Sequence, residues 1–262
     1  MREPAPPLEI NWPLPVPNWA DFLSSTATPA GTPVSEIVHV WAANLDLSVT
    51  ALEHLAVTLS RNESERASRF HFERDRNRYI AGRGLLRAVL GKYLQMPPAE
   101  VTLAYGPNGK PLLQSGVEQA TLHFNLTHSQ NLAVLAVTRA AQIGVDVEAV
   151  RPLSDAHELV DRFFSARESA AFESVPEAQK PLAFFNLWTR KEAWLKATGE
   201  GIGHLLNKVE VSFLPGEPAQ LLTLPQDSES RWTLTDLVPA PGFTAALAVA
   251  CSTPVLNCWR WS

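Results

Sequence analysis

Apolar residues recur along the chain with the two-residue period of strands or the 3.6-residue period of helices. Strand-like and helix-like segments follow in the same order in each half of the chain. The first half runs from a strand over 36–42, through helices over 52–59 and 62–95, to strands over 122–126 and 132–138. The second half runs from a strand over 143–148, through helices over 153–164, 166–173 and 181–198, to strands over 208–213, 231–236, 243–250 and 256–261. This order predicts an α/β (α+β) fold with two pseudo-symmetric lobes, each a small sheet packed with helices.

Glycines and prolines set the predicted boundaries. Gly82 and Gly84 are expected to interrupt the long helix of the first half, and Gly199 closes the last helix of the second. Residues 139–142 are expected to form a short hairpin-like link. Prolines are concentrated in residues 1–34, which predicts an arm without regular structure. The expected parts are the arm 1–34, an N-terminal lobe 35–141 and a C-terminal lobe 142–262.

Composition narrows the function classes. The 262 residues are 45% hydrophobic and 19% charged, which allows a sizeable core and excludes global disorder. A net charge of −5 argues against a general nucleic-acid binder. No apolar run reaches the ~18 residues of a membrane helix, and no secretion signal is present, so no membrane partner is expected. The two cysteines, Cys251 and Cys258, make neither a disulfide scaffold nor a zinc site, so a reduced, cytoplasmic setting is expected.

The strand over 143–148 carries two carboxylates on one face. Side chains alternate along a strand, so Ile143, Val145 and Val147 should point into the core. Asp146 and Glu148 then share the opposite face, with Cα atoms ~7 Å apart. Two carboxylates facing one way can bind one hard cation such as Mg²⁺, and the alternative is an ordinary solvated strand face.

The helix over 181–198 aligns an aromatic, an acid and a base. Trp188, Glu192 and Lys196 follow at intervals of four residues and therefore share one face. The helix is apolar nearly all round, so a buried Glu–Lys pair needs a partner more than a surface pair does. A third metal carboxylate and a lysine that faces phosphate would satisfy that need, whereas the alternative is an ordinary surface ion pair.

Two polar segments and one basic segment complete the set of candidates. The strand end Phe124–Ser129 gathers Asn125, Thr127, His128 and Ser129, which suit phosphate binding, a Ser–His nucleophile pair or a plain turn. The turn at 105–111 contains two glycines and lacks the spacing of a P-loop. Residues 61–92 carry nine basic and four acidic residues, a net charge of +5 that suggests an anionic ligand, and the alternative is a solvated helix face, which is usual for such charge runs.

Together these motifs resemble the 4′-phosphopantetheinyl transferases, specifically their larger, monomeric, Sfp-like type that activates peptide and polyketide synthetases. The resemblance covers residues 34–213 and preserves the order and spacing of the motifs. The matching segments are RYIAGR (78–83), GKP (109–111), FNLTHS (124–129), GVDVE (144–148), RFFSARE (162–168) and WTRKEAWLK (188–196). The resemblance implies the two-lobed transferase fold, with coenzyme A bound between the lobes.

The resemblance also implies roles for individual residues. Mg²⁺ would be held by Asp146, Glu148 and Glu192 together with the pyrophosphate of coenzyme A, and the catalytic residues would be Glu192, Lys196 and Asp146. Glu168 matches an acid of the family taken as structural or adjacent to the metal. Glu63 stands where some members place a basic contact to the 3′-phosphate, and Thr127 replaces the commoner serine. The residues expected to bind coenzyme A are Arg66, Arg78, Arg83, Asn108, Gly109, Lys110, Pro111, Asn125, Thr127, His128 and Lys196.

The implied reaction moves phosphopantetheine from coenzyme A to a serine of an apo acyl or peptidyl carrier protein and releases 3′,5′-ADP. Lys196 would assist the leaving group, and Glu192 would remove the serine proton directly or through a water. A monomer is expected because both lobes lie in one chain. The competing hypotheses are another Mg-dependent phosphodiester-cleaving enzyme and a non-catalytic binder of carrier protein or coenzyme A. A Ser–His hydrolase is disfavoured because no G-x-S-x-G elbow is present.

Overall fold

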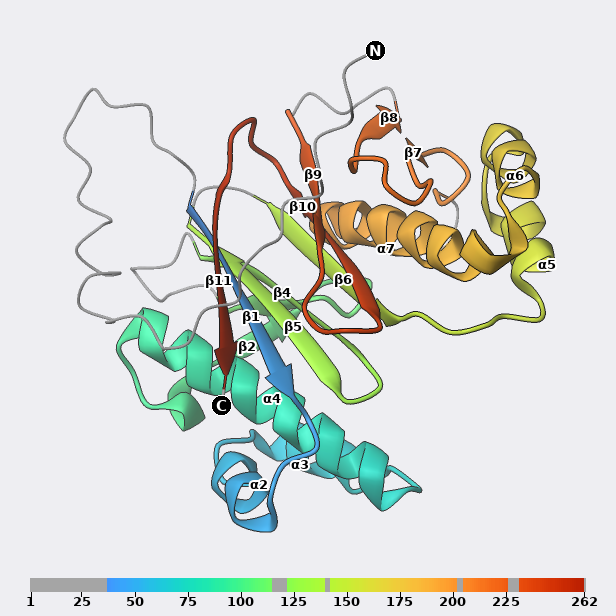
Figure 1. Ribbon diagram of the computed structural model, residues 1–262. Helices are drawn as coiled ribbons and strands as arrows, with labels where there is room; N and C mark the ends of the chain where they lie inside the picture. Colours follow the sequence, from blue (N-terminus) through green and yellow to red (C-terminus); the bar gives the residue numbers. More distant parts are fainter. Residues whose placement is uncertain (1–36, 115–121, 140–141, 202–204, 226–230, 262) are drawn as a thin grey trace, which may run out of the picture.

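In the residues that the structure describes, a four-stranded and a three-stranded sheet lie at the centre and carry helices on their outer faces (Figure 1). This computed structural model describes residues 37–114, 122–139, 142–201, 205–225 and 231–261. The predicted arm 1–34 lies outside the described residues. None of the described helices is long and apolar enough to cross a membrane.

The four-stranded sheet has the order β11-β1-β5-β4. Its strands are β1 (Ile37–Asn44), β4 (His123–Ser129), β5 (Leu132–Thr138) and β11 (Val255–Trp261). β1 pairs antiparallel with β5 and parallel with β11, so the last strand of the chain lies in the sheet of the first half. β11 belongs to the predicted C-terminal lobe 142–262, but it pairs with β1 of the predicted N-terminal lobe 35–141.

The three-stranded sheet has the order β6-β10-β9 and is antiparallel. Its strands are β6 (Ile143–Ala149), β9 (Thr233–Leu237) and β10 (Phe243–Val249). β6 pairs with β10 and not with β5, so β5 and β6 are not the two paired strands of a hairpin, contrary to the prediction for 139–142, of which residues 140–141 lie outside the described residues. Two small pairs complete the strands, β2 (Leu103–Tyr105) with β3 (Pro111–Leu113) and β7 (Glu210–Val211) with β8 (Leu221–Thr223).

The two larger sheets share a core. Val38 and Val40 of β1 lie in one apolar cluster with Ile143, Val145 and Val147 of β6, all at most 1% exposed. The inward face predicted for the strand over 143–148 is therefore confirmed. Burying such side chains contributes roughly 1.5–3 kcal/mol each, so this cluster fixes how the two sheets pack.

The helices depart from the prediction in the first half. The pattern over 62–95 divides into two helices, and the second continues without interruption through Gly82 and Gly84. Gly84 serves packing instead, because a Cβ there would lie 2.5 Å from Leu55 Cβ. The helices are α2 (Val49–Ala56), α3 (Arg61–Ala67), α4 (Glu73–Leu94), α5 (Ala156–Phe163), α6 (Ala166–Glu173) and α7 (Lys180–Thr198), with short 3₁₀ turns η1 (Pro98–Glu100) and η2 (Glu177–Gln179).

α7 lies against β6 and β10 and is buried on most of its surface. It ends at Gly199 in the left-handed conformation, with φ of 79°, as the sequence predicts. Its closest approach to β6 is at Gly144, where a Cβ would lie 2.1 Å from the Ala193 oxygen and 2.3 Å from the Ala197 nitrogen. Only glycine allows this approach, which brings the polar side chains of α7 next to those of β6.

Substituting this glycine should separate helix and strand. The Gly144→Ala variant should lose about 1–3 kcal/mol of unfolding free energy in urea titration, since backbone atoms of α7 must move. Gly82→Ala is the control, because its nearest neighbour would be Leu45 Cδ2 at 3.9 Å, and it should keep or raise the midpoint. Equal midpoints for both variants would contradict the close packing at Gly144.

Candidate active site

The site forms where β4 lies beside β6, which belongs to the other sheet. There the backbone of β6 forms hydrogen bonds with side chains of β4. Asn125 Oδ1 accepts a hydrogen bond from the Val145 nitrogen at 2.8 Å, and Ser129 Oγ accepts one from the Ala149 nitrogen at 3.2 Å. Both bonds join residues 20 positions apart, so the two strands run in the same direction.

The same side of β4 also contacts the predicted carboxylates. Thr127 Oγ1 donates to Asp146 Oδ1 at 3.1 Å, and Ser129 Oγ donates to Glu148 Oε2 at 2.7 Å. Asp146 is only 3% exposed, which rules out the solvated-face alternative for this residue. The junction therefore places two acids on β6 and gives each a hydroxyl partner on β4.

α7 adds the predicted acid and base. Lys196 Nζ donates to Asp146 Oδ1 at 2.5 Å and to Thr127 Oγ1 at 3.1 Å. Glu192, one turn earlier on the same face, is 3% exposed. The sequence spacing thus correctly brings Glu192 and Lys196 to the carboxylates of β6. In this structure the ammonium group of Lys196 faces Asp146.

Burial and mutual repulsion change the titration of these acids. Burial, and then the nearby charges of Asp146 and Glu148, raise the pKa of Glu192 to about 7, against the attraction of Lys196. Burial also raises the pKa of Glu148, although the Ser129 hydroxyl opposes the shift. A carboxyl group whose pKa lies near neutrality can accept and release a proton at physiological pH.

Two buried carboxylate oxygens of this cluster lack a hydrogen-bond partner among the described residues, Asp146 Oδ2 and Glu192 Oε1. Unpaired buried oxygens are costly, and a hard cation would satisfy them. No three acid, histidine or cysteine side chains of the described chain already converge as a complete ligand set. The oxygen donors nevertheless fit Mg²⁺ chemically, and the ligand set Asp146, Glu148 and Glu192 stays a prediction.

A cavity of about 260 Å³ lies against α7, where Glu192 and Lys196 line it. Several predicted residues from distant parts of the sequence meet in its wall. Asn108 Nδ2 donates to the Gly199 oxygen at 2.8 Å, so the turn between β2 and β3 lies on the end of α7. The residues that line the cavity are Asn108, Gly109, Lys110, Pro111, Asn125, Leu126, Glu192, Leu195, Lys196, Gly199 and Gly201.

The Lys110 side chain is held by backbone carbonyls, whereas the residue itself is predicted to bind coenzyme A. Its Nζ donates to the oxygens of Ile143 at 3.0 Å, Lys196 at 2.5 Å and Ala197 at 3.2 Å. Burial lowers its pKa to about 8. All three ammonium protons are therefore used by backbone carbonyls, which leaves the backbone of the turn as the part of Lys110 that can contact coenzyme A.

His128 lies on the opposite side of β4 from Thr127 and Ser129, because neighbouring residues of a strand point to opposite faces. Its side chain is exposed in part. Partial burial, and then the charges of Lys196 and Arg78, lower the pKa of His128. Arg78 itself makes a two-pronged ion pair with Asp46 at 2.6 and 2.8 Å.

Arg83 is placed differently from the prediction. Its Nε donates to Glu63 Oε1 at 2.6 Å, its Nη2 donates to the Tyr105 hydroxyl at 2.9 Å, and the residue is 9% exposed. Arg87 binds the other oxygen of Glu63 at 2.6 Å. Glu63 is thus a buried counterion that joins α3 to α4, and the position of Arg83 does not support the predicted phosphate contact.

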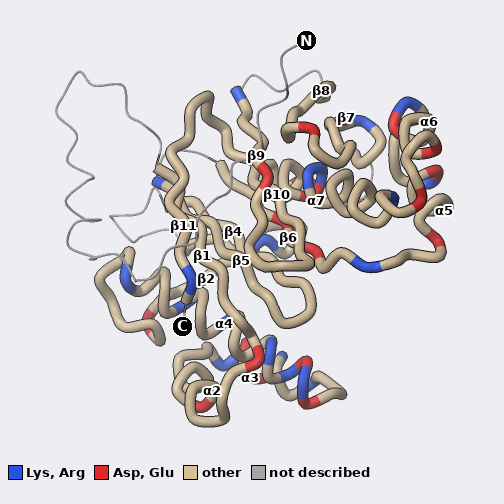
Figure 2. The backbone as a smooth tube through the Cα atoms, viewed as in Figure 1, with Lys and Arg blue, Asp and Glu red and all other residues tan. Residues whose placement is uncertain are grey.

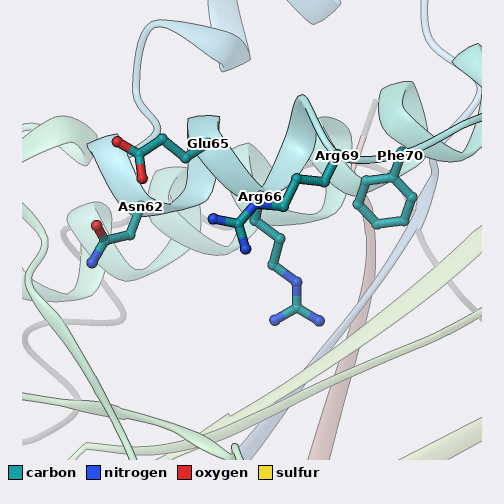
Figure 3. Close-up of a pocket in the computed structure, with 5 residues that line it drawn as sticks. All are labelled: Asn62, Glu65, Arg66, Arg69 and Phe70. Carbon is teal, nitrogen blue, oxygen red and sulfur yellow. The ribbon is translucent and has the colours of Figure 1, made fainter.

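Six of the nine basic residues of this segment take part in ion pairs, and basic and acidic residues are interspersed on α3 and the start of α4 (Figure 2). Among the described ion pairs, none includes Arg66 or Arg69. Both line a pocket of about 600 Å³ with Phe70, and their guanidinium groups extend away from the helix backbone (Figure 3). Arg66 also lies 5.6 Å from the ring of Tyr79. The contact of Arg66 with an anion stays a prediction.

Comparisons with known proteins agree with this site. The family model of the 4′-phosphopantetheinyl transferase superfamily matches residues 142–251, and the model of the 4′-phosphopantetheinyl transferase N-terminal part matches residues 46–140. The 4′-phosphopantetheinyl transferase HetI of Nostoc sp. is 47% identical over 219 residues, which cover 84% of this chain and 90% of HetI. The chain belongs to the 4′-phosphopantetheinyl transferase superfamily.

More distant relatives extend the same result to the predicted family type. The 4′-phosphopantetheinyl transferase psf-1 of Bacillus pumilus is 34% identical over 60% of this chain and 64% of its own length. The 4′-phosphopantetheinyl transferase Sfp of Bacillus subtilis is 27% identical over 78% of this chain and 88% of its own length. The predicted family and enzyme class are therefore confirmed for this transferase.

Two residues of the transferase have contacts that sequence reasoning left open or missed. Glu168 Oε2 accepts from Lys191 Nζ at 2.5 Å, and Oε1 accepts from the Val211 nitrogen at 3.1 Å, so Glu168 is a structural acid that joins α6, α7 and β7. The sequence suggests phosphate binding, a nucleophile pair or a turn for Ser129, whereas its hydroxyl contacts Glu148. Its position two residues after Thr127, on the same face of one strand, was the available signal.

The raised pKa of Glu192 predicts a pH-dependent stability for the transferase. The folded protein holds this proton with a pKa of about 7 and the unfolded chain near 4.5, so stability falls as pH rises between these values. In Mg²⁺-free urea titrations, Glu192→Gln should therefore gain stability relative to the unmodified transferase between about pH 5 and about pH 8. A stability difference that is constant over this range would contradict the shift.

Proposed function

We propose that this transferase moves 4′-phosphopantetheine from coenzyme A to the serine hydroxyl of an apo acyl or peptidyl carrier protein. The observation that carries this proposal is the meeting of Asp146, Glu192 and Lys196 beside the cavity walled by the Asn108–Pro111 turn. Such transfers depend mainly on positioning and on charge stabilisation, and this site offers both. The relatives named for the same activity support the assignment.

The cavity and the basic surfaces suit different parts of coenzyme A. The glycine-containing turn gives backbone access for a planar adenine, since Gly109 has φ of 77° and nothing would lie within 4 Å of a Cβ there. Lys196 and Thr127, which both contact Asp146, are proposed to contact the pyrophosphate, and His128, on the other face of β4, stays a predicted contact. Arg66 is proposed to bind the 3′-phosphate with support from Arg78. Arg78 forms an ion pair with Asp46, and the Asp46 side chain is 48% exposed to solvent.

Asp146, Glu148 and Glu192 are proposed to hold Mg²⁺ together with the pyrophosphate. When bound, the cation neutralises charge on the phosphates and favours departure of the leaving group. The unpaired oxygens of Asp146 and Glu192 support this ligand set. The Lys196 ammonium, now facing Asp146, is close enough to the same region to bind the phosphate that leaves.

The proposed reaction breaks one bond and forms one bond at the β-phosphorus. The carrier serine oxygen bonds to that phosphorus, the bond from phosphorus to the bridging oxygen breaks, and 3′,5′-ADP leaves. Glu192 accepts the serine proton, for which its pKa of about 7 is suitable. Lys196 stabilises the negative charge on the departing phosphate. Both lobes of the site lie in one chain, which supports action as a monomer.

Substitution of Glu192 and Lys196 tests these roles through release of 3′,5′-ADP. Glu192→Gln should reduce carrier-dependent release by about 10²–10⁴-fold. Lys196→Ala should reduce turnover by about 10²–10³-fold, with a smaller effect on the Kd for coenzyme A. Glu177→Gln, on an acid whose side chain is 85% exposed, is the control and should retain activity.

The same assay separates the competing hypotheses. Another phosphodiester-cleaving enzyme would release 3′,5′-ADP without carrier protein, and a non-catalytic binder would release none with it. Near-normal turnover of Glu192→Gln would contradict the role of Glu192. A loss confined to coenzyme A affinity in Lys196→Ala would contradict its role in the leaving step.

A further inference from the structure

We infer that Ser129 is a positioning residue that orients Glu148 for cation binding, an inference that rests on the proposed function. Ser129 ends β4, is 8% exposed, and contacts two neighbouring residues of β6 through one oxygen. The Ala149 nitrogen can only donate, so Ser129 Oγ accepts from it at 3.2 Å. The hydroxyl proton is then directed to Glu148 Oε2, 2.7 Å away.

This arrangement repeats at the neighbouring acid. Thr127, two residues earlier on β4, donates to Asp146 Oδ1 and leaves Asp146 Oδ2 without a partner among the described residues. Ser129 likewise occupies Oε2 of Glu148, and the described residues place no hydrogen-bond donor on Oε1. Each hydroxyl of β4 therefore binds one oxygen of an acid on β6 and leaves the other oxygen without a described donor, free to accept a cation.

The geometry also excludes the nucleophile role for Ser129. A nucleophilic serine needs a base that accepts its proton, whereas the neighbouring His128 points to the opposite face of the strand. The proton of Ser129 is already directed to a carboxylate that is expected to bind a cation. Partners of this kind orient metal ligands, and their loss commonly weakens metal binding or activity by about 10–100-fold.

Asn125 supplies a matched control within the same strand. Its Oδ1 accepts from the Val145 nitrogen, as Ser129 Oγ accepts from the Ala149 nitrogen, but its side chain makes no described hydrogen bond to an acid. Removal of either side chain loosens the junction of β4 and β6. Only the removal of the Ser129 side chain also removes the hydrogen bond to Glu148. Comparison of the Ser129 and Asn125 variants therefore distinguishes an effect on strand position from an effect on the orientation of Glu148.

The experiment measures Mn²⁺ binding by electron paramagnetic resonance, with no coenzyme A present, for the full chain and its variants. Ser129→Ala should weaken Mn²⁺ binding by about 10–100-fold, whereas Asn125→Ala should leave it within about threefold. Ser129→Thr keeps the hydroxyl and should restore binding. Should Ser129→Ala fail to fold, Ser129→Cys, with its weak donor, takes its place and should also bind more weakly.

Equal Mn²⁺ affinity in Ser129→Ala and the unmodified chain would overturn the role of Ser129 alone and leave the proposed ligand set standing. An equal loss in Ser129→Ala and Asn125→Ala would also overturn it, because strand positioning would then explain the effect. If the unmodified chain binds no Mn²⁺, both the proposed ligand set and this inference fail.

Discussion

The side-by-side placement of β4 and β6 is the constraint on which the rest of the site depends. These strands belong to different sheets, and their neighbouring edges are joined by Asn125, Thr127 and Ser129. Such a junction leaves acids of β6 buried against polar side chains, where a continuous apolar core would exclude them. The cost of burying the Asp146 charge is offset by two hydrogen bonds, one of them from a lysine.

The second requirement is the close approach of α7. Gly144 lets the helix lie almost on the backbone of β6, and Lys110 then fills the space between the helix end and the strand with three hydrogen bonds. Lys110 comes from the first half of the sequence and its partners from the second. The position of Lys196 therefore depends on contacts made by both halves, which explains why the site needs the whole fold.

The sequence predicted the elements with strong periodicity and the residues with regular spacing. The inward face of β6, the end of α7 at Gly199 and the placement of Glu192 and Lys196 on one face of α7 followed from periods of two and 3.6 residues. The partner of β6 and the addition of β11 to the first sheet could not be predicted this way, because strand pairing depends on contacts far apart in sequence. The continuity of α4 at Gly84 depended likewise on Leu55 of another helix.

Charge counting was the least informative part of the prediction. The basic excess in 61–92 predicted an anionic ligand, but it could not show that Glu63 would be buried between Arg83 and Arg87. A charged residue in a helix has the same sequence pattern whether it faces solvent or a buried counterion. Arg66 and Arg83 were therefore indistinguishable in sequence, and only the packing of α3 on α4 separates them.

The most direct test of the central claim is the intact mass of an apo carrier protein incubated with this chain, coenzyme A and Mg²⁺. The account predicts a gain of one phosphopantetheine group, about 340 Da, which is lost when a chelator removes the cation. An unchanged mass across several unrelated carrier proteins, with coenzyme A still bound by the chain, would contradict it.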